Sequence, residues 1–469
     1  MVGAQTVLTS KITNFNQAPI SSYSMQIKFF FQNNKVLLII LAGAFLASLA
    51  YSFYFRITPA VDARAYDVIA QNIISGVGFR EDISRTLAAD PAITRVGPLY
   101  EYFLAGLYKV FGRYYEVVWL AQAGLHALSA WLIYLTVLLI LADHDKKKKI
   151  GLWAAAIFGF YPDLIEISAM LMTETFYLFL TCLLVYVFFA FIWRPDFYLA
   201  AALGLSAGLA VLARPPVLFL IPVILFYFWR KKFWRQAALF LLVLALVFTP
   251  WTWRNYQIYH QLMPFGNGGA LNFWIGNYHG GDGEQGLTVE QMQFLSSHDA
   301  SEVSGESVKR FKSFLFGYPL EFIKLTLLRI NKYFSFIRPM GFWFYQQGLG
   351  QLLFILSSAA ASVFLFFFGL AGILKTIASR DKRLDYLLAL TIFTPLIIFI
   401  TVVETRYRFQ IYPLLAIFAG YFMAAWPFNQ PRWWREKTLR LAVGLVFLNG
   451  IIDLLLSLDR FKERLGLFF

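Results

Sequence analysis

The residues best suited to chemistry in this sequence are charged side chains at the edges of very apolar segments. They include the acids Asp62, Asp163 and Glu174 and the arginines Arg214 and Arg406. A carboxylate in such a place can take a proton or bind a cation, and an arginine can bind a phosphate through two parallel hydrogen bonds. Because charge is costly beside an apolar medium, each of these groups is a candidate functional residue.

Each candidate also has a structural explanation that the sequence alone leaves open. Asp62, the first acid of the chain, could be a solvated carboxylate beside lipid headgroups, and Glu174 could cap the start of a helix. Asp163 could merely reach water, and a single arginine could pair with a lipid phosphate. Arg406 and Arg408 fall at the expected start of a helix, where the helix dipole disfavours cations. Their position therefore favours a ligand.

Other polar residues border the same apolar segments or the loops between them. One of them, Asn277, lies in a Gly/Asn-rich loop (266–284) that lacks the G-K-[ST] of a phosphate-binding P-loop. Such a loop could present amide groups to a sugar, or it could be a simple turn-rich connection. The further candidates for substrate contact are Arg64, Asp67, Glu101, Lys109, Arg254, Asn255, Asn277, Glu404 and Arg408.

The elements that must position these residues follow from composition. The 469 residues are 59% hydrophobic and 14% charged, with a mean hydropathy of +0.60, whereas soluble proteins carry about 25% charged residues. These values exclude a soluble globular protein and a disordered chain, and the single cysteine, Cys182, excludes a disulfide within the chain. The sequence predicts an all-α, polytopic integral membrane protein.

Apolar runs long enough for a membrane helix, about 20 residues, recur along the chain. We expect about eleven transmembrane helices with additional interfacial helices on the outer face. The predicted spans are 35–55, 115–141, 150–168, 173–193, 197–212, 217–229, 237–253, 351–374, 384–403, 407–426 and 438–458.

A cluster of lysines, Lys146–Lys149, sets the predicted orientation. Because basic loops stay on the cytoplasmic side, this cluster places the tail 1–33 inside and the short segment 97–112 in the outer interface rather than across the membrane. The net charge of +14 then reflects cytoplasmic loops and predicts no nucleic-acid partner. The predicted divisions are a cytoplasmic tail (1–33), an N-terminal transmembrane module (34–253) with a first external loop (56–112), an external or interfacial segment (254–350) and a C-terminal transmembrane module (351–469).

Short motifs occur in a fixed order along nearly the whole chain. They are VDARAYDVIAQNIISGVG (61–78), GPLYEYFLAGLYKVFG (97–112), T-E (173–174), R-P (214–215), PWTWRNY (250–256), G-N (276–277) and RYR followed by a proline (406–413). In that order they resemble the GT-C superfamily of integral-membrane glycosyltransferases. The similarity is to the protein-mannosyltransferase and lipid A aminoarabinose-transferase group, glycosyltransferase family 39. The first loop departs from the pattern because it has D-A-R where many relatives carry two adjacent acids.

The resemblance implies an enzyme that takes a sugar from a polyprenyl-phosphate donor and transfers it, with inversion, on the non-cytoplasmic face of a prokaryotic cytoplasmic membrane. It implies that Asp62 is the catalytic base. The acceptor would be a lipid, a protein or a polysaccharide, and membrane lipids would surround the site. The only cofactor to consider is a divalent cation, for which Asp62, Asp163 and Glu174 are the available ligands. The implied phosphate partners are Arg214, Arg254, Arg406 and Arg408, and Glu101 and Lys109 would help to close the site.

Two functions from other classes stay open at this point. A carrier or flippase of lipid-linked sugars needs charges near the membrane midplane and usually an internal repeat, and the sequence shows neither. A non-catalytic membrane scaffold would leave the gathering of acids and arginines on one side unexplained. Within the enzyme class, an oligosaccharyltransferase is less favoured because the sequence shows no large soluble domain.

Overall fold

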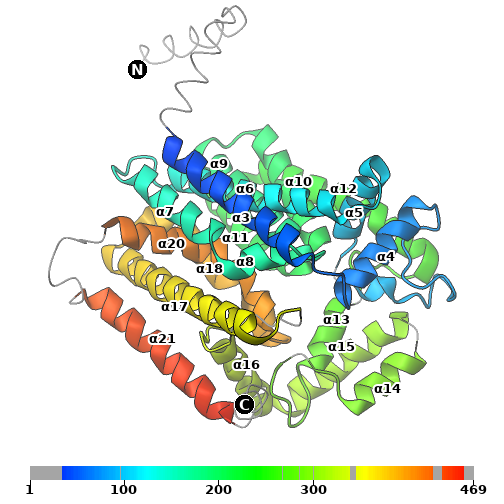
Figure 1. Cartoon of the computed structure of the whole chain (residues 1–469). Helices are drawn as coiled ribbons and strands as arrows, with labels where there is room; N and C mark the ends of the chain where they lie inside the picture. The colour runs from blue at the N-terminus through cyan, green and yellow to red at the C-terminus, as the bar shows by residue number, and fades with distance from the viewer. Residues whose placement is uncertain are drawn as a thin grey trace, which may run out of the picture.

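The structure, a computed structural model, is shown in Figure 1. It describes residues 34–458 apart from 96, 267, 285, 299, 339–344 and 426–435. Within these residues the regular secondary structure is helical, and one isolated parallel bridge joins Glu284 to Val403. The predicted all-α class is confirmed. The predicted cytoplasmic tail, 1–33, lies outside the described residues.

The helices follow one another with short connections, apart from the segments around α4 and α13–α16. The α-helices are α3 (Lys35–Phe55), α4 (Asp62–Ile74), α5 (Leu99–Phe111), α6 (Tyr115–Ile140), α7 (Lys147–Gly159), α8 (Pro162–Ser168), α9 (Thr173–Trp193), α10 (Phe197–Ala213), α11 (Ile221–Lys231), α12 (Trp234–Tyr259), α13 (Gly268–Ile275), α14 (Val289–Ser297), α15 (Ala300–Gly317), α16 (Pro319–Tyr333), α17 (Gly348–Ser379), α18 (Asp385–Phe393), α19 (Leu396–Ile400), α20 (Tyr412–Ala425) and α21 (Lys437–Leu456). The 3-10 helices are η2 (Pro91–Thr94), η3 (Pro215–Leu220), η4 (Lys382–Leu384) and η5 (Thr405–Ile411).

Seven helical segments of the described chain are long and apolar enough to cross a membrane, namely α3, α6, α9, α12, α17, the segment from η4 to α19, and α21. An eighth results if α7 and α8, bent by 57°, form one broken span. The bend has a local cause, because Pro162 starts α8 and disfavours helical geometry in the residue before it. Every predicted span is helical, but α10, α11 and α20 are shorter than a full span. The count of about eleven stays a prediction.

The helices pack as one bundle. α6 contacts α3, α7 and α9, α10 contacts α9 and α12, and α20 lies between α7 and α17. Helices in a membrane associate through close packing, for which small residues are needed at the contact. Gly372 of α17 is such a residue, because a Cβ added to it would lie 2.0 Å from the carbonyl oxygen of Phe418 in α20.

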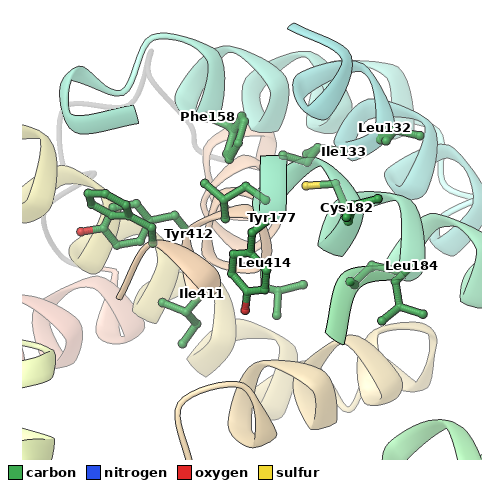
Figure 2. Close-up of a cluster of buried hydrophobic side chains, with 14 of the residues drawn as sticks. Leu132, Ile133, Phe158, Tyr177, Cys182, Leu184, Ile411, Tyr412 and Leu414 are labelled. Carbon is green, nitrogen blue, oxygen red and sulfur yellow. The ribbon is translucent and has the colours of Figure 1, made fainter. Parts of the chain in front are cut away.

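Buried apolar side chains from both predicted transmembrane modules form one continuous core. Figure 2 shows part of it, with Ile133 of α6, Phe158 of α7, Cys182 of α9 and Leu414 of α20 gathered between the helices. Because the modules 34–253 and 351–469 share this core, they are not separate folding units in space. The boundary drawn between them stays a prediction.

The elements predicted to be external gather at one end of the bundle. Figure 1 shows α4, α13, α14 and α15 there, while the connection between α6 and α7, next to the lysine cluster at the start of α7, lies at the other end. α5, predicted to be interfacial, has 13 residues and is too short to span a membrane upright. The arrangement brings the candidate polar residues of the first loop close to those that precede α20.

The α17–α20 contact can be tested through Gly372. We expect Gly372→Val to lower the free energy of unfolding by roughly 1–3 kcal/mol, because the added side chain meets backbone that cannot move aside. The measurement is thermal unfolding of the detergent-purified protein. Gly444→Val is the matched control, since Gly444 is exposed on α21 with no atom near its Cβ position. Equal changes in melting temperature for the two variants would contradict this packing.

Candidate active site

Asp62 is the first residue of α4, directly after a strained position in the backbone. The residue before it, Val61, has a φ of 47°, a left-handed value that a β-branched side chain rarely adopts. Such strain persists only where the surrounding structure imposes it, and it is often found at functional sites. As the helical period predicts, Tyr66 continues the Asp62 face of α4 and Asp67 points elsewhere.

Two guanidinium groups hold the Asp62 carboxylate, one on each oxygen. Arg95 donates from Nη1 to Oδ1 at 3.1 Å, and Arg406 donates from Nη1 to Oδ2 at 3.2 Å. Each arginine also binds a second acid, since Arg95 Nε donates to Glu81 at 2.7 Å and Arg406 Nε donates to Glu404 at 2.8 Å. The carboxylate of Asp62 is therefore both charge-compensated and fixed in orientation.

The same network continues to the start of α9. Glu174 is buried in the first turn of α9 and accepts a hydrogen bond at 2.5 Å from Nη1 of Arg214, which directly follows α10. Nη1 of Arg406 lies 4.0 Å from the same oxygen of Glu174. Asp62, Arg406, Glu174 and Arg214 thus form one chain of alternating charges, which we call the central ion network. The guanidinium groups of Arg214 and Arg406 each lie 5.5 Å from the ring centre of Tyr407.

The charge of Arg406 is stabilised by these surroundings. Burial by itself disfavours a cation, but the carboxylates of Glu404, Glu174 and Asp62 and the hydroxyl of Tyr407 together hold the pKa of Arg406 well above its usual value. Arg406 is therefore charged at neutral pH. A permanent cation beside a carboxylate suits the binding of a phosphate and the stabilisation of a leaving anion.

The central ion network borders a cavity of about 860 Å³. Asp62, Arg95, Arg214 and Arg406 line it on one side. The rest of the wall is mainly apolar and comes from η3, α13, α19 and the loop before α13. The large apolar side chains of this wall include Leu218, Phe219, Phe265, Leu271, Phe273, Ile275, Leu287, Ile397 and Ile398. A cavity of this size with a charged end and an apolar body fits a ligand that has an anionic head and a hydrocarbon tail.

Several other predicted candidates serve as tethers. Asp67 is buried, and its carboxylate accepts hydrogen bonds from Tyr108 at 2.7 Å, from Arg113 at 2.6 Å and from Tyr115 at 3.0 Å. These bonds fix α4 to α5 and to the start of α6. Arg64 and Lys109 are exposed and line no part of the cavity.

Arg254 and Asn255, at the end of α12, hold the loop between α4 and α5 and the segment that follows α12, respectively. Arg254 donates to the carbonyl of Phe79 at 3.0 Å, and its guanidinium lies 4.9 Å from the ring centre of Trp251. Asn255 is fully buried and donates to the carbonyl of Met263 at 2.9 Å. The PWTWRNY motif is thus occupied with loop attachment and does not line the cavity.

Asp163 and Arg408 also lie away from the cavity. Asp163 is fully buried on α8, which packs against α17. Arg408 is buried as well and donates to the carbonyl of Ser335 at 2.7 Å and to that of Arg338. The two arginines of the RYR motif therefore diverge, since Arg406 faces Asp62 and Arg408 holds the segment that follows α16.

Asn277 and Glu101 are buried beside the site without lining the cavity. Asn277 donates to the carbonyls of Phe273 and Ile400, and its Oδ1 accepts from Arg329. Glu101 is completely buried on α5, and neither of its carboxyl oxygens has a hydrogen-bond partner among the described residues. Burial raises the pKa of Glu101 to about 8, although the charge of Arg95 acts in the opposite direction.

The sequence reasoning missed Arg95, the second cation on Asp62, together with its partner Glu81. A signal was available, because Arg95 lies two residues before the G-P-L-Y motif, close to a predicted interfacial helix, much as Asp62 lies close to the end of the first span. Tyr66 and Tyr407, two further residues of the cavity wall, were not predicted as site residues, although Tyr66 follows Asp62 at helical spacing and Tyr407 lies between the two arginines of the RYR motif.

The predicted ligands do not fit a bound metal ion. Both oxygens of Asp62 face guanidinium groups, Glu174 is paired with Arg214, and Asp163 lies elsewhere. In the part of the chain that the structure describes, no three His, Cys, Asp or Glu side chains gather closely enough to hold a metal. The chemistry proposed below therefore uses no metal ion.

Comparison with known proteins finds one family match and several solved structures of similar fold. Residues 95–253 match the family model for dolichyl-phosphate-mannose-protein mannosyltransferases. No protein in the curated set matches the chain. The solved oligosaccharyltransferase of Archaeoglobus fulgidus in its apo form aligns with a TM-score of 0.50 and 16% identity, over 90% of this chain and 54% of that protein.

The complex of the same Archaeoglobus fulgidus enzyme with zinc and sulfate gives a TM-score of 0.50 and 16% identity, over 88% of this chain and 52% of that one. ArnT from Cupriavidus metallidurans, bound to undecaprenyl phosphate, aligns with a TM-score of 0.46 and 14% identity, over 88% of this chain and 63% of that protein. The chain thus spans between 52% and 63% of the length of these proteins.

The family match over residues 95–253 and the shared fold agree with the resemblance to the GT-C superfamily of membrane glycosyltransferases that the motifs predicted.

Glu101 predicts how stability depends on pH. Its pKa is about 8 in the folded protein against 4.5 for the free group, so between these values the unfolded chain loses a proton that the folded protein keeps. Stability should therefore fall as pH rises from about 4.5 to 8, by an amount on the order of 2–4 kcal/mol. In Glu101→Gln this part of the fall should be absent, as measured by thermal unfolding across the pH range. Parallel pH profiles for the two proteins would contradict the buried, neutral state of Glu101.

Proposed function

We propose that this protein is an inverting glycosyltransferase that moves a sugar from a polyprenyl-phosphate donor to an acceptor on the non-cytoplasmic face of the membrane. The observation that carries the proposal is the presence of one carboxylate, Asp62, and three arginines on the wall of a single large and mainly apolar cavity. A carrier of lipid-linked sugars needs such a cavity but has no need of a carboxylate fixed between cations. A non-catalytic scaffold needs neither.

In this proposal Asp62 is the catalytic base. The acceptor oxygen attacks the anomeric carbon of the sugar from the side opposite the phosphate, and Asp62 takes the proton of the acceptor hydroxyl. The bond between the anomeric carbon and the phosphate oxygen breaks, and its electron pair leaves with the polyprenyl phosphate. Inversion by one displacement needs no second, nucleophilic carboxylate. The central ion network agrees with a single catalytic carboxylate, because the other acid, Glu174, is already paired with Arg214.

The arginines would bind the departing phosphate. Arg406 and Arg214 line the cavity beside Asp62, and Arg95 approaches Asp62 from the other side. Cations placed where negative charge develops lower the barrier to leaving-group departure. The apolar wall beyond them, from Phe219 to Ile398, would receive the first part of the hydrocarbon chain.

The identity of the donor class rests on two supports. The family model that matches residues 95–253 is named for a dolichyl-phosphate sugar, and a lipid-linked donor reaches such a cavity from the membrane in which the apolar helices lie. The proposed orientation rests on the lysine cluster at the start of α7, at the end of the bundle opposite α4 (Figure 1). The acceptor is a hydroxyl-bearing lipid, protein or polysaccharide, and we place the enzyme in a prokaryotic cytoplasmic membrane.

The base assignment is tested with Asp62→Asn. Because loss of a general base typically lowers a rate by 10²–10⁴-fold, we expect at least about a 100-fold fall in kcat for transfer from a polyprenyl-phosphate sugar. The assay follows released polyprenyl phosphate and the glycosylated acceptor by mass spectrometry. Asp82→Asn is the matched control, since Asp82 is an acid of the same external loop that pairs only with its neighbours Ser84 and Arg85 and should leave the rate unchanged.

Two outcomes would count against the proposal. Unchanged transfer by Asp62→Asn would remove Asp62 as the base. Translocation of the lipid-linked sugar across the membrane by the unmodified protein, with no glycosylated product formed from any acceptor, would favour the carrier instead.

A further inference from the structure

Arg329 is a completely buried cation that the proposed reaction does not use. It lies on α16, has no ion-pair partner in the described part of the chain, and donates all of its recorded hydrogen bonds to neutral oxygens. An arginine is seldom buried without a carboxylate unless fixed dipoles compensate its charge. The positions of its acceptors explain how this site compensates it.

The acceptors of Arg329 are groups at the ends of two helices. Nη1 donates to the carbonyl of Phe399 at 2.8 Å, in the last turn of α19, and Nη2 donates to the carbonyl of Gly276, directly after α13. Nη2 also donates to Oδ1 of Asn277 at 2.6 Å. The last carbonyls of a helix lack helical partners and carry partial negative charge, so a cation is favoured there. One guanidinium therefore caps the C-terminal ends of both helices.

The two capped helices meet along a close backbone contact. A Cβ added to Gly276 would lie 1.8 Å from the carbonyl oxygen of Thr401, so only glycine fits. Asn277 donates to the carbonyl of Ile400 at 3.1 Å, and Val403 donates its backbone N–H to Gly283 at 2.9 Å. We call this contact, between 276–284 and 399–403, the seam.

Both sides of the seam continue into the cavity wall. α13 supplies residues 268–273 and 275 to it, and the other side supplies Ile397, Ile398, Thr401 and Val402. Three residues beyond Val403 in the chain stands Arg406, whose Nη1 lies 3.2 Å from Asp62. The position of Arg406 relative to Asp62 therefore depends on where the seam holds the segment that precedes η5.

We propose that Arg329 is a positioning residue that closes the seam and thereby sets Arg406 against Asp62. This inference rests on the proposed function for its catalytic consequence, but the closure of the seam is a property of the fold alone. Arg329 touches no residue of the central ion network, and it acts through the backbone of Phe399 and Gly276.

The test compares Arg329→Met with Arg329→Lys, because a lysine keeps the charge and can still donate to one or two of the three acceptors. Lys324→Met, a change at an exposed cation of the same helix, is the matched control. Hydrogen–deuterium exchange of peptides covering 268–277 and 396–403 reports the seam. The kcat for transfer from an undecaprenyl-phosphate sugar, measured on monodisperse protein, reports the alignment of Arg406.

For Arg329→Met we expect exchange to be about tenfold faster in both peptides and kcat to fall about 100-fold, since an ångström of misplacement can remove that much of a rate. The kcat of Arg329→Lys should be at least about tenfold higher than that of Arg329→Met, and the kcat of Lys324→Met should match that of the unmodified protein. Unchanged exchange in either peptide, an unchanged kcat in Arg329→Met, or an Arg329→Lys as slow as Arg329→Met would overturn the inference.

The two proposals fail separately. If the unmodified protein transfers no sugar from the undecaprenyl-phosphate donor, the proposed function fails. Exchange alone then decides whether Arg329 closes the seam, with faster exchange in both peptides supporting it and unchanged exchange overturning it.

Discussion

The arrangement of the site depends on the ion pairs that one guanidinium group, that of Arg406, makes with three acids. This group lies within hydrogen-bond reach of Asp62 and Glu404 and within 4.0 Å of Glu174, and it joins residues 344 positions apart in the chain. A buried charge that loses one of its partners typically costs 3–5 kcal/mol, so these groups must be placed together or not at all. The fold satisfies this demand by bringing the start of α4, the start of α9 and the segment before α20 together.

The polar residues around the central ion network mostly hold loops. The segments at this end share a small apolar cluster, to which Ile69, Phe79 and Ile93 belong, and hydrogen bonds and ion pairs add to it. Asp67 attaches α4 to α5 and α6, Arg254 attaches the first loop to α12, and Arg408 holds the chain that follows α16. These tethers explain why charged residues are concentrated at this end although only four of them line the cavity.

The fold class and the central part of the site could be predicted from the sequence, because both depend on patterns that a membrane makes strict. Apolar runs gave the helices, and the cost of charge beside lipid singled out Asp62, Glu174, Arg214 and Arg406. The same argument cannot tell a ligand-facing charge from a buried tether. Asp67 made that limit visible, since it looks like Asp62 in the sequence and serves a different purpose.

Two further features lay beyond sequence reasoning for physical reasons. The number of spans depends on breaks such as the one before Pro162 and on helices shorter than a bilayer, such as α20, whose burial in the bundle only the structure reveals. The role of Arg329 depends on contacts with the carbonyls of Gly276 and Phe399, which are backbone groups that every residue carries. No residue pattern marks a backbone acceptor.

The proposed mechanism requires that a lipid-linked phosphate binds where Asp62, Arg214 and Arg406 meet. The most direct measurement is a cryo-electron microscopy structure of the protein with undecaprenyl phosphate. We expect phosphate density next to Asp62, within hydrogen-bond distance of Arg406 and of at least one of Arg214 and Arg95. The hydrocarbon chain should lie along the apolar wall of the cavity. A headgroup bound elsewhere, for example beside Asp163, with the cavity filled only by solvent, would contradict it.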